Sequence, residues 1–148
     1  MPEAAGRPPA SPRRSSRAAG RRTAVEILYQ ADVTGRPPSE VLREWDGAGR
    51  TVSRFARELV EGVERHRPEV DSLLGRHVRG WTVERMAAVD RTILRVASFE
   101  LLHRSDVPPA AAISEAVAAA NELSTEESGR FVNGILGAIA RDLAVGSG

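Results

Sequence analysis

The stretch "MAAVDRTILRVASFELL", residues 86–102, decides the fold of this chain. Apolar residues occupy most of its positions and do not alternate with the period of two that a half-buried strand shows. A helix of this composition carries apolar side chains on nearly every side, which is typical of a helix buried among others. Asp90 and Arg91 interrupt the pattern, either because they lie at a solvent-exposed end or because they meet a partner. We therefore expect a buried helix at the centre of the second half of the chain.

Amphipathic segments lie on both sides of this stretch. Their apolar residues recur with the spacing of one helix face, and breaks rich in glycine and proline separate them. We expect helices that include residues 17–33, 39–45, 52–63, 70–74, 86–102, 108–120 and 124–143. Thr51 is expected to cap the third helix, and Ser124 with Glu127 matches the capping box of the last. The prediction is an all-α fold of about seven helices in two small three-helix groups, joined near residues 68–82.

The composition is that of an ordinary globular protein. Of the 148 residues, 41% are hydrophobic and 28% are charged, which is enough for one domain with a core. The chain has no cysteine, which excludes disulfides and thiolate metal sites. No apolar run approaches the ~20 residues of a membrane span, and the N-terminus lacks the apolar segment of a secretory signal. We expect a cytoplasmic protein without membrane association.

All 21 basic residues are arginines, and they are unevenly distributed. Residues 1–22 hold six arginines and one acid, a net charge of +5, while the remainder holds 15 arginines and 19 acids, a net charge of −4. Residues 1–16 lack the apolar side chains needed for packing, so we expect a disordered basic arm there and a single domain over residues 17–145. The arm is either a contact for an anionic partner or a solvated tail.

Motifs for catalysis are absent from the sequence. There is no P-loop, no dinucleotide-binding fingerprint and no nucleophile elbow. His66, His77 and His103 lie far apart in the sequence, on different expected helices and without metal-ligand spacing, so we interpret them as surface or packing residues. We therefore expect a binding module rather than an enzyme, with no metal and no cofactor.

The C-terminal stretch "SGRFVNGILGAIARDL", residues 128–143, has two faces on a helical wheel. One face is apolar and is expected to join the core: Val132, Ile135, Leu136, Ile139 and Leu143. The other is small in its middle and basic at its ends: Arg130, Asn133, Gly134, Gly137 and Arg141. Phe131 falls on the border between them. The second face either binds RNA, with arginine on phosphate and an aromatic ring on a base, or lets a neighbouring helix approach at the glycines while Phe131 joins the core.

Two stretches of the chain resemble the NusB family of bacterial transcription antitermination factors. They are "RRTAVEILYQAD" (21–32) and "VDRTILRVASFELLHRSDVPPAAAISEAVAAANELSTEESGRFVNGIL" (89–136). The second contains an acid before I-L-R-x-A-x-[YF]-E-L, then D-V-P, and closes on [ED]-S-x-[KR]-F-V-N-G. The resemblance extends over residues 17–143, and the closing motif together with D-V-P makes it specific.

The resemblance implies an all-helical fold of two small subdomains and a function without catalysis. It implies binding to the single-stranded boxA RNA of ribosomal-RNA leader transcripts, jointly with the small-subunit ribosomal protein that acts as NusE. The pair would join the RNA polymerase antitermination complex and suppress premature termination. The resemblance leaves a homodimer open, because some members self-associate and bury the arginine-rich surface.

Carried over by position, the resemblance assigns RNA contacts to Arg17, Arg21, Arg22, Arg130, Phe131 and Asn133, with Arg13 and Arg14 as further candidates. It places Asp90 and Glu127 at or near the NusE-binding side, where an acidic surface would face a basic ribosomal protein. Two alternatives stay open. NusB-like domains also begin some ribosomal-RNA cytosine methyltransferases, which an intact gene ending at Gly148 would exclude. A helical interaction module without RNA binding would lose no activity when residues 1–22 are deleted.

Overall fold

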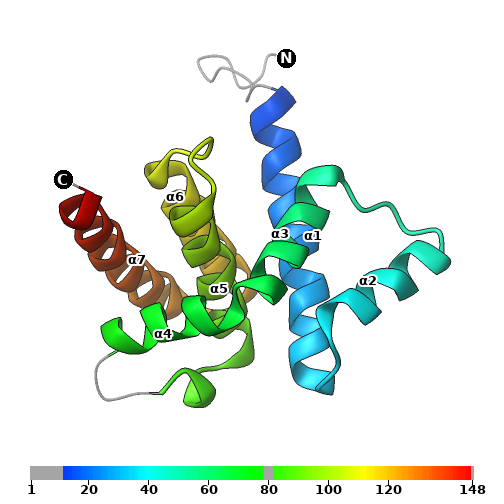
Figure 1. The fold of residues 1–148 in the computed structure, drawn as a ribbon, viewed down its shortest axis with the longest axis horizontal. Coiled ribbons are helices and arrows are strands. Elements are labelled where there is room, and N and C mark those ends of the chain that lie inside the picture. Colours follow the sequence, from blue (N-terminus) through cyan, green and yellow to red (C-terminus); the bar gives the residue numbers. More distant parts are fainter. Residues whose placement is uncertain (1–11, 79–81, 148) are drawn as a thin grey trace, which may run out of the picture.

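The computed structural model describes residues 12–78 and 82–147. Within these ranges the chain forms seven α-helices and one short 3₁₀ helix, without β-strands, which confirms the all-α prediction (Figure 1). The helices are α1 (Pro12–Thr34), α2 (Pro38–Gly47), α3 (Arg54–Arg65), α4 (Arg67–His77), α5 (Ala88–His103), α6 (Pro109–Leu123) and α7 (Glu126–Ser147), and the 3₁₀ helix is Val83–Arg85. None of these helices is both long and apolar enough to cross a membrane.

Helix α5 is buried, as the sequence predicted. Every residue from Thr92 to Glu100 is buried. The helix packs against α1, α3, α4, α6 and α7, so neighbours surround most of its circumference. Because α1 and α3 are among these neighbours, α5 is the centre of the whole described structure and not of its second half alone.

The helices form two groups around α5. Helices α1, α2 and α3 pack on one another, and α5, α6 and α7 form the second group (Figure 1). Helix α4 follows α3 after a single residue, His66, and packs against α5 and α7, so it joins the groups near the predicted position. Apolar side chains from all seven α-helices merge into one core cluster. The two groups are therefore parts of one packed unit.

Helix α1 is longer than predicted. It begins at Pro12, so residues 12–16, expected to belong to a disordered arm, are helical, while residues 1–11 lie outside the described ranges. Proline suits the first turn of a helix and arginine is a good helix former, whereas the prediction considered only the lack of apolar side chains. The side chains of Arg13 and Arg14 lie outside the described part of the chain.

The caps of two helices also differ from the prediction. Ser53, not Thr51, caps α3, because its Oγ accepts a backbone N–H of the first turn at 3.1 Å. Thr125, rather than Ser124 with Glu127, caps α7, where its Oγ1 accepts a backbone N–H at 3.0 Å. In both cases the sequence offers two neighbouring hydroxyl residues, and the one that directly precedes the first helical turn is the cap.

Gly62 allows α3 to pack closely on α5. A Cβ atom at Gly62 would overlap the buried ring of Phe99. Gly75, within α4, has no such neighbour, because a Cβ atom there meets nothing within 4 Å.

We expect Gly62→Ala to lower the free energy of unfolding by about 1–3 kcal/mol, the usual cost of overpacking a core. Gly75→Ala is the matched control and should raise the free energy of unfolding by up to ~1 kcal/mol, since alanine is the better helix former where space is open. Urea denaturation followed by circular dichroism measures both values. Equal effects of the two substitutions would contradict the close packing of α3 on α5.

Candidate nucleic-acid interface

Arg21 lies inside the molecule, contrary to its predicted role as an RNA contact. Its guanidinium forms a bidentate ion pair with Glu100 of α5, with Nε 3.0 Å from both carboxylate oxygens and Nη2 2.8 Å from Oε2. Glu100 is 1% exposed, so its charge requires a partner within the core. Losing one partner of such a pair typically costs about 3–5 kcal/mol. Arg21 therefore holds α1 against α5 and does not present its guanidinium to a ligand.

The other two candidates on α1, Arg17 and Arg22, are partly exposed and paired with acids. Nη2 of Arg17 donates to Oδ2 of Asp106 at 2.6 Å, and Arg22 forms an ion pair with Glu122 in α6. Asp106 also binds Arg104, and the hydrogen bonds from Arg104 and then Arg17 hold the pKa of Asp106 well below its ordinary range. Either arginine can bind a phosphate only by sharing or exchanging its acid.

The exposed face of α7 carries polar groups that are free of such pairing. Arg130 and Asn133 are exposed, and neither side chain forms an ion pair or hydrogen bond with the described residues. They line an open groove between α6 and α7, and the other lining residues are Val117, Asn121, Glu126 and Gly129. This face is the part of the predicted RNA surface that is available to a ligand.

The glycines of α7 separate the two interpretations of this face. A Cβ atom at Gly134 meets nothing within 4 Å, and one at Gly137 meets only Nη1 of Arg141, at 3.4 Å, so neither is needed for helix packing. A Cβ atom at Gly129, by contrast, would overlap the side chain of Asn121 in α6. Close packing is therefore the role of Gly129, which the prediction did not single out, although its place three residues before the apolar stripe was an available signal.

Phe131 lies at the border of the two faces of α7, as predicted. Its side chain is half-buried and packs against the apolar core, while Val132 beside it in the sequence is fully buried. Only part of the ring is thus available to stack on a base. Phe131 therefore packs against the core, as one interpretation predicted, and also keeps part of its ring at the surface, as the other requires.

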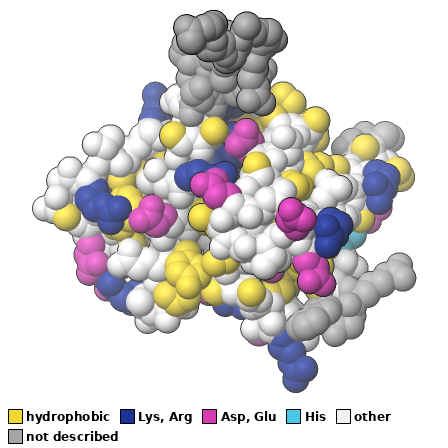
Figure 2. Space-filling view, turned by 180° about the vertical axis from the view of Figure 1, so that it is seen from behind, with side chains coloured by type: hydrophobic (Ala, Val, Ile, Leu, Met, Phe, Trp, Pro, Cys, Tyr) yellow, Lys and Arg dark blue, Asp and Glu magenta, His cyan; other side chains and the backbone are white. Residues whose placement is uncertain are grey.

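Helix α6 lies between the two groups of candidate RNA contacts (Figure 1). On one side Glu122 of α6 pairs with Arg22, and on the other Asn121 shares a groove with Arg130 and Asn133. Over the face drawn in Figure 2, arginines and acids are interspersed rather than gathered by sign. The candidate contacts therefore lie in two separate places that flank α6, each with an acid nearby.

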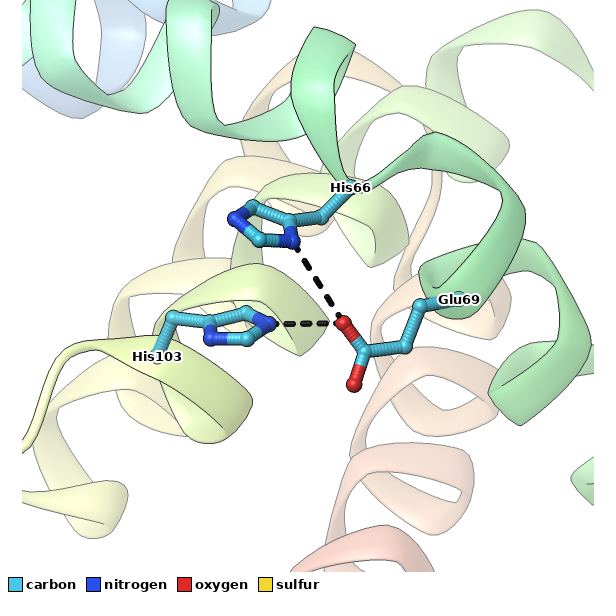
Figure 3. Close-up of side chains that lie close together, drawn as sticks. All are labelled: His66, Glu69 and His103. Carbon is cyan, nitrogen blue, oxygen red and sulfur yellow. Dashed lines mark hydrogen bonds and ion pairs between the residues drawn. The ribbon is translucent and has the colours of Figure 1, made fainter.

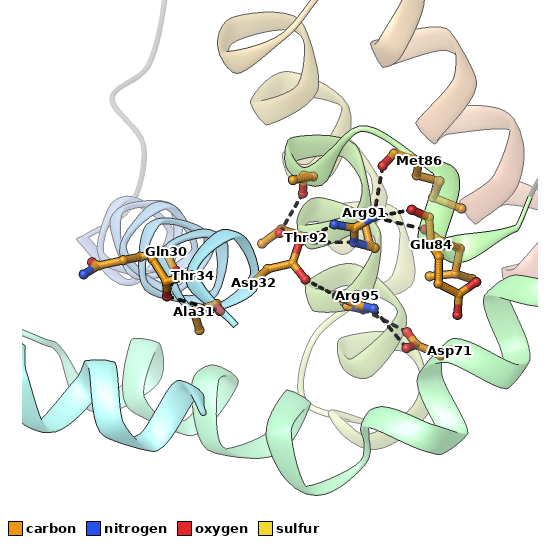
Figure 4. Close-up of polar contacts among 12 residues, drawn as sticks. Gln30, Ala31, Asp32, Thr34, Asp71, Glu84, Met86, Arg91, Thr92 and Arg95 are labelled. Atoms are coloured by element: carbon orange, nitrogen blue, oxygen red, sulfur yellow. Dashed lines mark hydrogen bonds and ion pairs between the residues drawn. The ribbon is translucent and has the colours of Figure 1, made fainter. Parts of the chain in front are cut away.

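Arg91 is half-buried, and its guanidinium is bound within the chain rather than projecting into solvent (Figure 4). It donates to backbone carbonyls within residues 83–86 at 3.0–3.3 Å and forms an ion pair with Asp32 of α1. Arg95, one turn later and buried, binds Asp71 of α4 at 2.8 Å and Asp32 at 3.4 Å. This network joins α1, α4 and α5. The sequence did not predict it, because Asp32 and Arg95 are 63 positions apart.

Asp90 is buried in the first turn of α5 and contacts the start of α7. Its Oδ2 accepts a hydrogen bond from Ser128 Oγ at 3.2 Å, while Oδ1 has no partner among the described residues. Burial raises the pKa of Asp90, and the hydrogen bond from Ser128 partly opposes that shift. Glu127 precedes Ser128 and is exposed. The two acids predicted to bind a partner thus lie at the same end of α7, but only Glu127 is open to direct contact.

Two of the three histidines meet in space, contrary to what their separation in the sequence suggested. His66 and His103 stack with their ring centroids 4.0 Å apart, and Glu69 lies beside them. His77 pairs separately with Asp142. His66 and His103 are therefore packing residues, one of the two interpretations that the sequence left open.

Known proteins resemble this chain over most of its length. The model of the NusB family matches residues 18–141. The transcription antitermination protein NusB of Symbiobacterium thermophilum is 43% identical over 144 residues, which cover 90% of this chain and 94% of the relative. The structure of T. maritima NusB gives a TM-score of 0.76 at 32% identity, over 84% of this chain and 90% of the other. The structure of antitermination factors NusB and NusE in complex with double-stranded RNA gives a TM-score of 0.77 at 29% identity, over 86% of this chain and 98% of the matched chain.

The raised pKa of Asp90 makes its contribution to stability depend on pH. The pKa of Asp90 in the folded state lies above its unfolded value of about 3.9, so the folded state binds the proton more tightly. The contribution of Asp90 to the free energy of unfolding therefore becomes more favourable as the pH falls through the range between the two pKa values. We expect the unfolding free energy of the wild type, relative to that of Asp90→Asn, to be higher at pH 4 than at pH 7. Urea denaturation at both pH values measures this difference, and a difference that does not change with pH would contradict the burial of an ionised Asp90.

Proposed function

The chain belongs to the NusB family, and we propose that it is an RNA-binding transcription antitermination factor. In this proposal it binds single-stranded boxA RNA of ribosomal-RNA leader transcripts together with the ribosomal protein NusE. It then joins the RNA polymerase antitermination complex in the cytoplasm and suppresses premature termination, without catalysis. The observation that carries the proposal is the similarity in sequence and fold, over most of the chain, to NusB proteins, including one solved with NusE and RNA.

The proposed RNA contacts are of two kinds. Arg130 and Asn133 are unpaired and line an open groove, so they can bind a phosphate and a base edge directly, with the exposed part of Phe131 beside them. Arg17 and Arg22 keep part of their guanidinium groups exposed and can transfer from their acids to phosphates, which accept the same charge-assisted hydrogen bonds. RNA that contacts both areas would cross α6.

The proposed surface for NusE lies where α7 begins. Glu127 is exposed there, and an acid suits a partner that is a basic ribosomal protein. Asp90 is buried beneath it and is hydrogen-bonded to Ser128, the residue that follows Glu127. We therefore assign the direct contact to Glu127, and Asp90 acts on the same surface by holding the first turn of α7.

The proposed RNA contacts on α1 are also compatible with a homodimer of the chain. A homodimer that covers the α1 arginines would compete with RNA, because Arg17 and Arg22 cannot serve both. Sedimentation of the protein with and without RNA distinguishes competing states from independent ones.

We expect Arg130→Ala to weaken binding of a single-stranded boxA-like RNA and to reduce the slope of log K against log salt concentration by about 0.7, the value for one phosphate contact on a single strand. Arg43→Ala removes an exposed arginine of α2 and is the matched control, which should leave affinity and slope unchanged. Fluorescence anisotropy at several salt concentrations, with and without NusE, gives both quantities. Equal losses in the two variants would contradict an RNA surface on α7.

A duplex of the same sequence tests the strandedness of the RNA. We expect it to bind more weakly than the single strand, because base edges and ring faces are accessible only where bases are unpaired. Tighter binding of the duplex would contradict the assignment to single-stranded RNA. The comparison of Arg130→Ala with Arg43→Ala would still test whether α7 binds RNA.

We expect Glu127→Arg to weaken the binding of NusE by about tenfold or more, since a like charge placed against a basic partner costs several kcal/mol. Glu61→Arg makes the same charge change on α3, at an exposed acid away from this surface, and should leave the affinity unchanged. Calorimetric titration of NusE into each variant measures the constants. Unchanged affinity in Glu127→Arg would show that NusE binds elsewhere.

A further inference from the structure

Two histidines and a glutamate form a cluster where α3, α4 and α5 meet (Figure 3). His66 is the residue between α3 and α4, Glu69 lies in the first turn of α4, and His103 ends α5. Nδ1 of His66 lies 3.5 Å and Nε2 of His103 lies 2.7 Å from the same atom, Oε1 of Glu69. One donor atom from each of the three residues lies within 4.8 Å of the other two. Both rings thus direct a nitrogen toward one point beside the carboxylate.

The two imidazoles pack on one side against the core. Their rings stack on each other, and the buried ring of Phe99 lies 5.9 Å from that of His66 and 5.6 Å from that of His103. The imidazoles are about one-third exposed, at 32% and 31%, whereas the Glu69 side chain is 52% exposed. An ion from solvent can therefore reach one nitrogen of each ring, and the more exposed carboxylate has the most freedom to adjust.

We propose that His66, Glu69 and His103 form a binding site for a divalent transition-metal ion, with zinc as the reference ion. Zinc takes imidazole nitrogen at about 2.0–2.1 Å and carboxylate oxygen at about 2.0–2.2 Å, usually in a tetrahedron. A metal lies close to the plane of each imidazole ring that binds it, so the two stacked rings and the exposed Glu69 side chain must all rotate for the three donors to surround one ion. Water completes the fourth position. Imidazole donors favour zinc, copper or nickel over magnesium and calcium, which are bound mainly by oxygen.

A metal bound here would link the start of α4, the helix that connects the two groups, to the end of the central helix α5. His66 and Glu69 flank the start of α4, and His103 belongs to α5. Among the described residues, none hydrogen-bonds to the second ring nitrogen of His66 or His103. Such outer partners typically strengthen metal binding by about 10- to 100-fold, so this site should bind zinc more weakly than a dedicated structural site. We therefore expect zinc to stabilise the folded chain without being required for folding.

Calorimetric titration of the full-length chain, free of any affinity tag, with zinc chloride tests the proposal. We expect one zinc ion per chain, and a loss of affinity of about tenfold or more in His103→Ala and in Glu69→Gln. Glu69→Gln changes one exposed side chain at constant size, so it keeps the test valid if His103→Ala does not fold. His77→Ala is the matched control, because His77 has Asp142 as its acidic partner in a separate place and should not affect binding. Magnesium chloride should give no binding.

Thermal unfolding provides a second readout. At one zinc concentration, zinc should raise the Tm of the wild type and of His77→Ala by more than that of Glu69→Gln, because the stabilisation grows with the affinity of the folded state for the ion. The absence of zinc binding by the wild type would overturn the proposal, as would equal zinc affinity in the wild type and Glu69→Gln. Binding that is lost in His77→Ala and kept in His103→Ala would place the ion elsewhere and would also overturn it.

Discussion

The buried ion pair between Arg21 and Glu100 is the contact on which the arrangement of the helices depends. A carboxylate on the central helix requires a cation, and Arg21 supplies it from α1. Near the C-terminal end of α1, Asp32 is the acid of a second set of ion pairs and accepts from Arg91 and Arg95 of α5. Arg21 precedes Asp32 along α1, whereas its partner Glu100 follows Arg91 and Arg95 along α5. The two helices therefore run antiparallel and are joined by ion pairs at two places. This arrangement determines where every exposed side chain of α1 lies.

The arginines of α1 consequently have different tasks despite their proximity in the sequence. Arg21 turns inward and holds the helix, whereas Arg17 and Arg22 remain at the surface on acids that are more exposed than Glu100. A basic run at the start of a helix therefore contains both buried structural members and members that stay at the surface. Their separation follows the helical period, because only one of these positions points at α5.

Features that depend on local periodicity could be predicted from the sequence. The burial of α5 and the two faces of α7 are of this kind, since each follows from the spacing of apolar residues along one helix. Features that depend on a distant partner could not. Arg21 looks like any cation until Glu100, 79 positions away, is placed beside it. The cluster of His103 and Glu69, 34 positions apart, has the same origin.

Asp106 and Glu122 occupy, on Arg17 and Arg22, the place that a phosphate would take. These carboxylates compete with a phosphate for the two guanidinium groups. The binding free energy that a polyanion gains at each arginine is therefore only the difference between a phosphate and a carboxylate as its partner. Once displaced, each acid remains nearby and repels the incoming chain. In the proposed interface, an anion that contacts α1 alone would therefore gain little, and only a ligand that also reaches α7 would bind well.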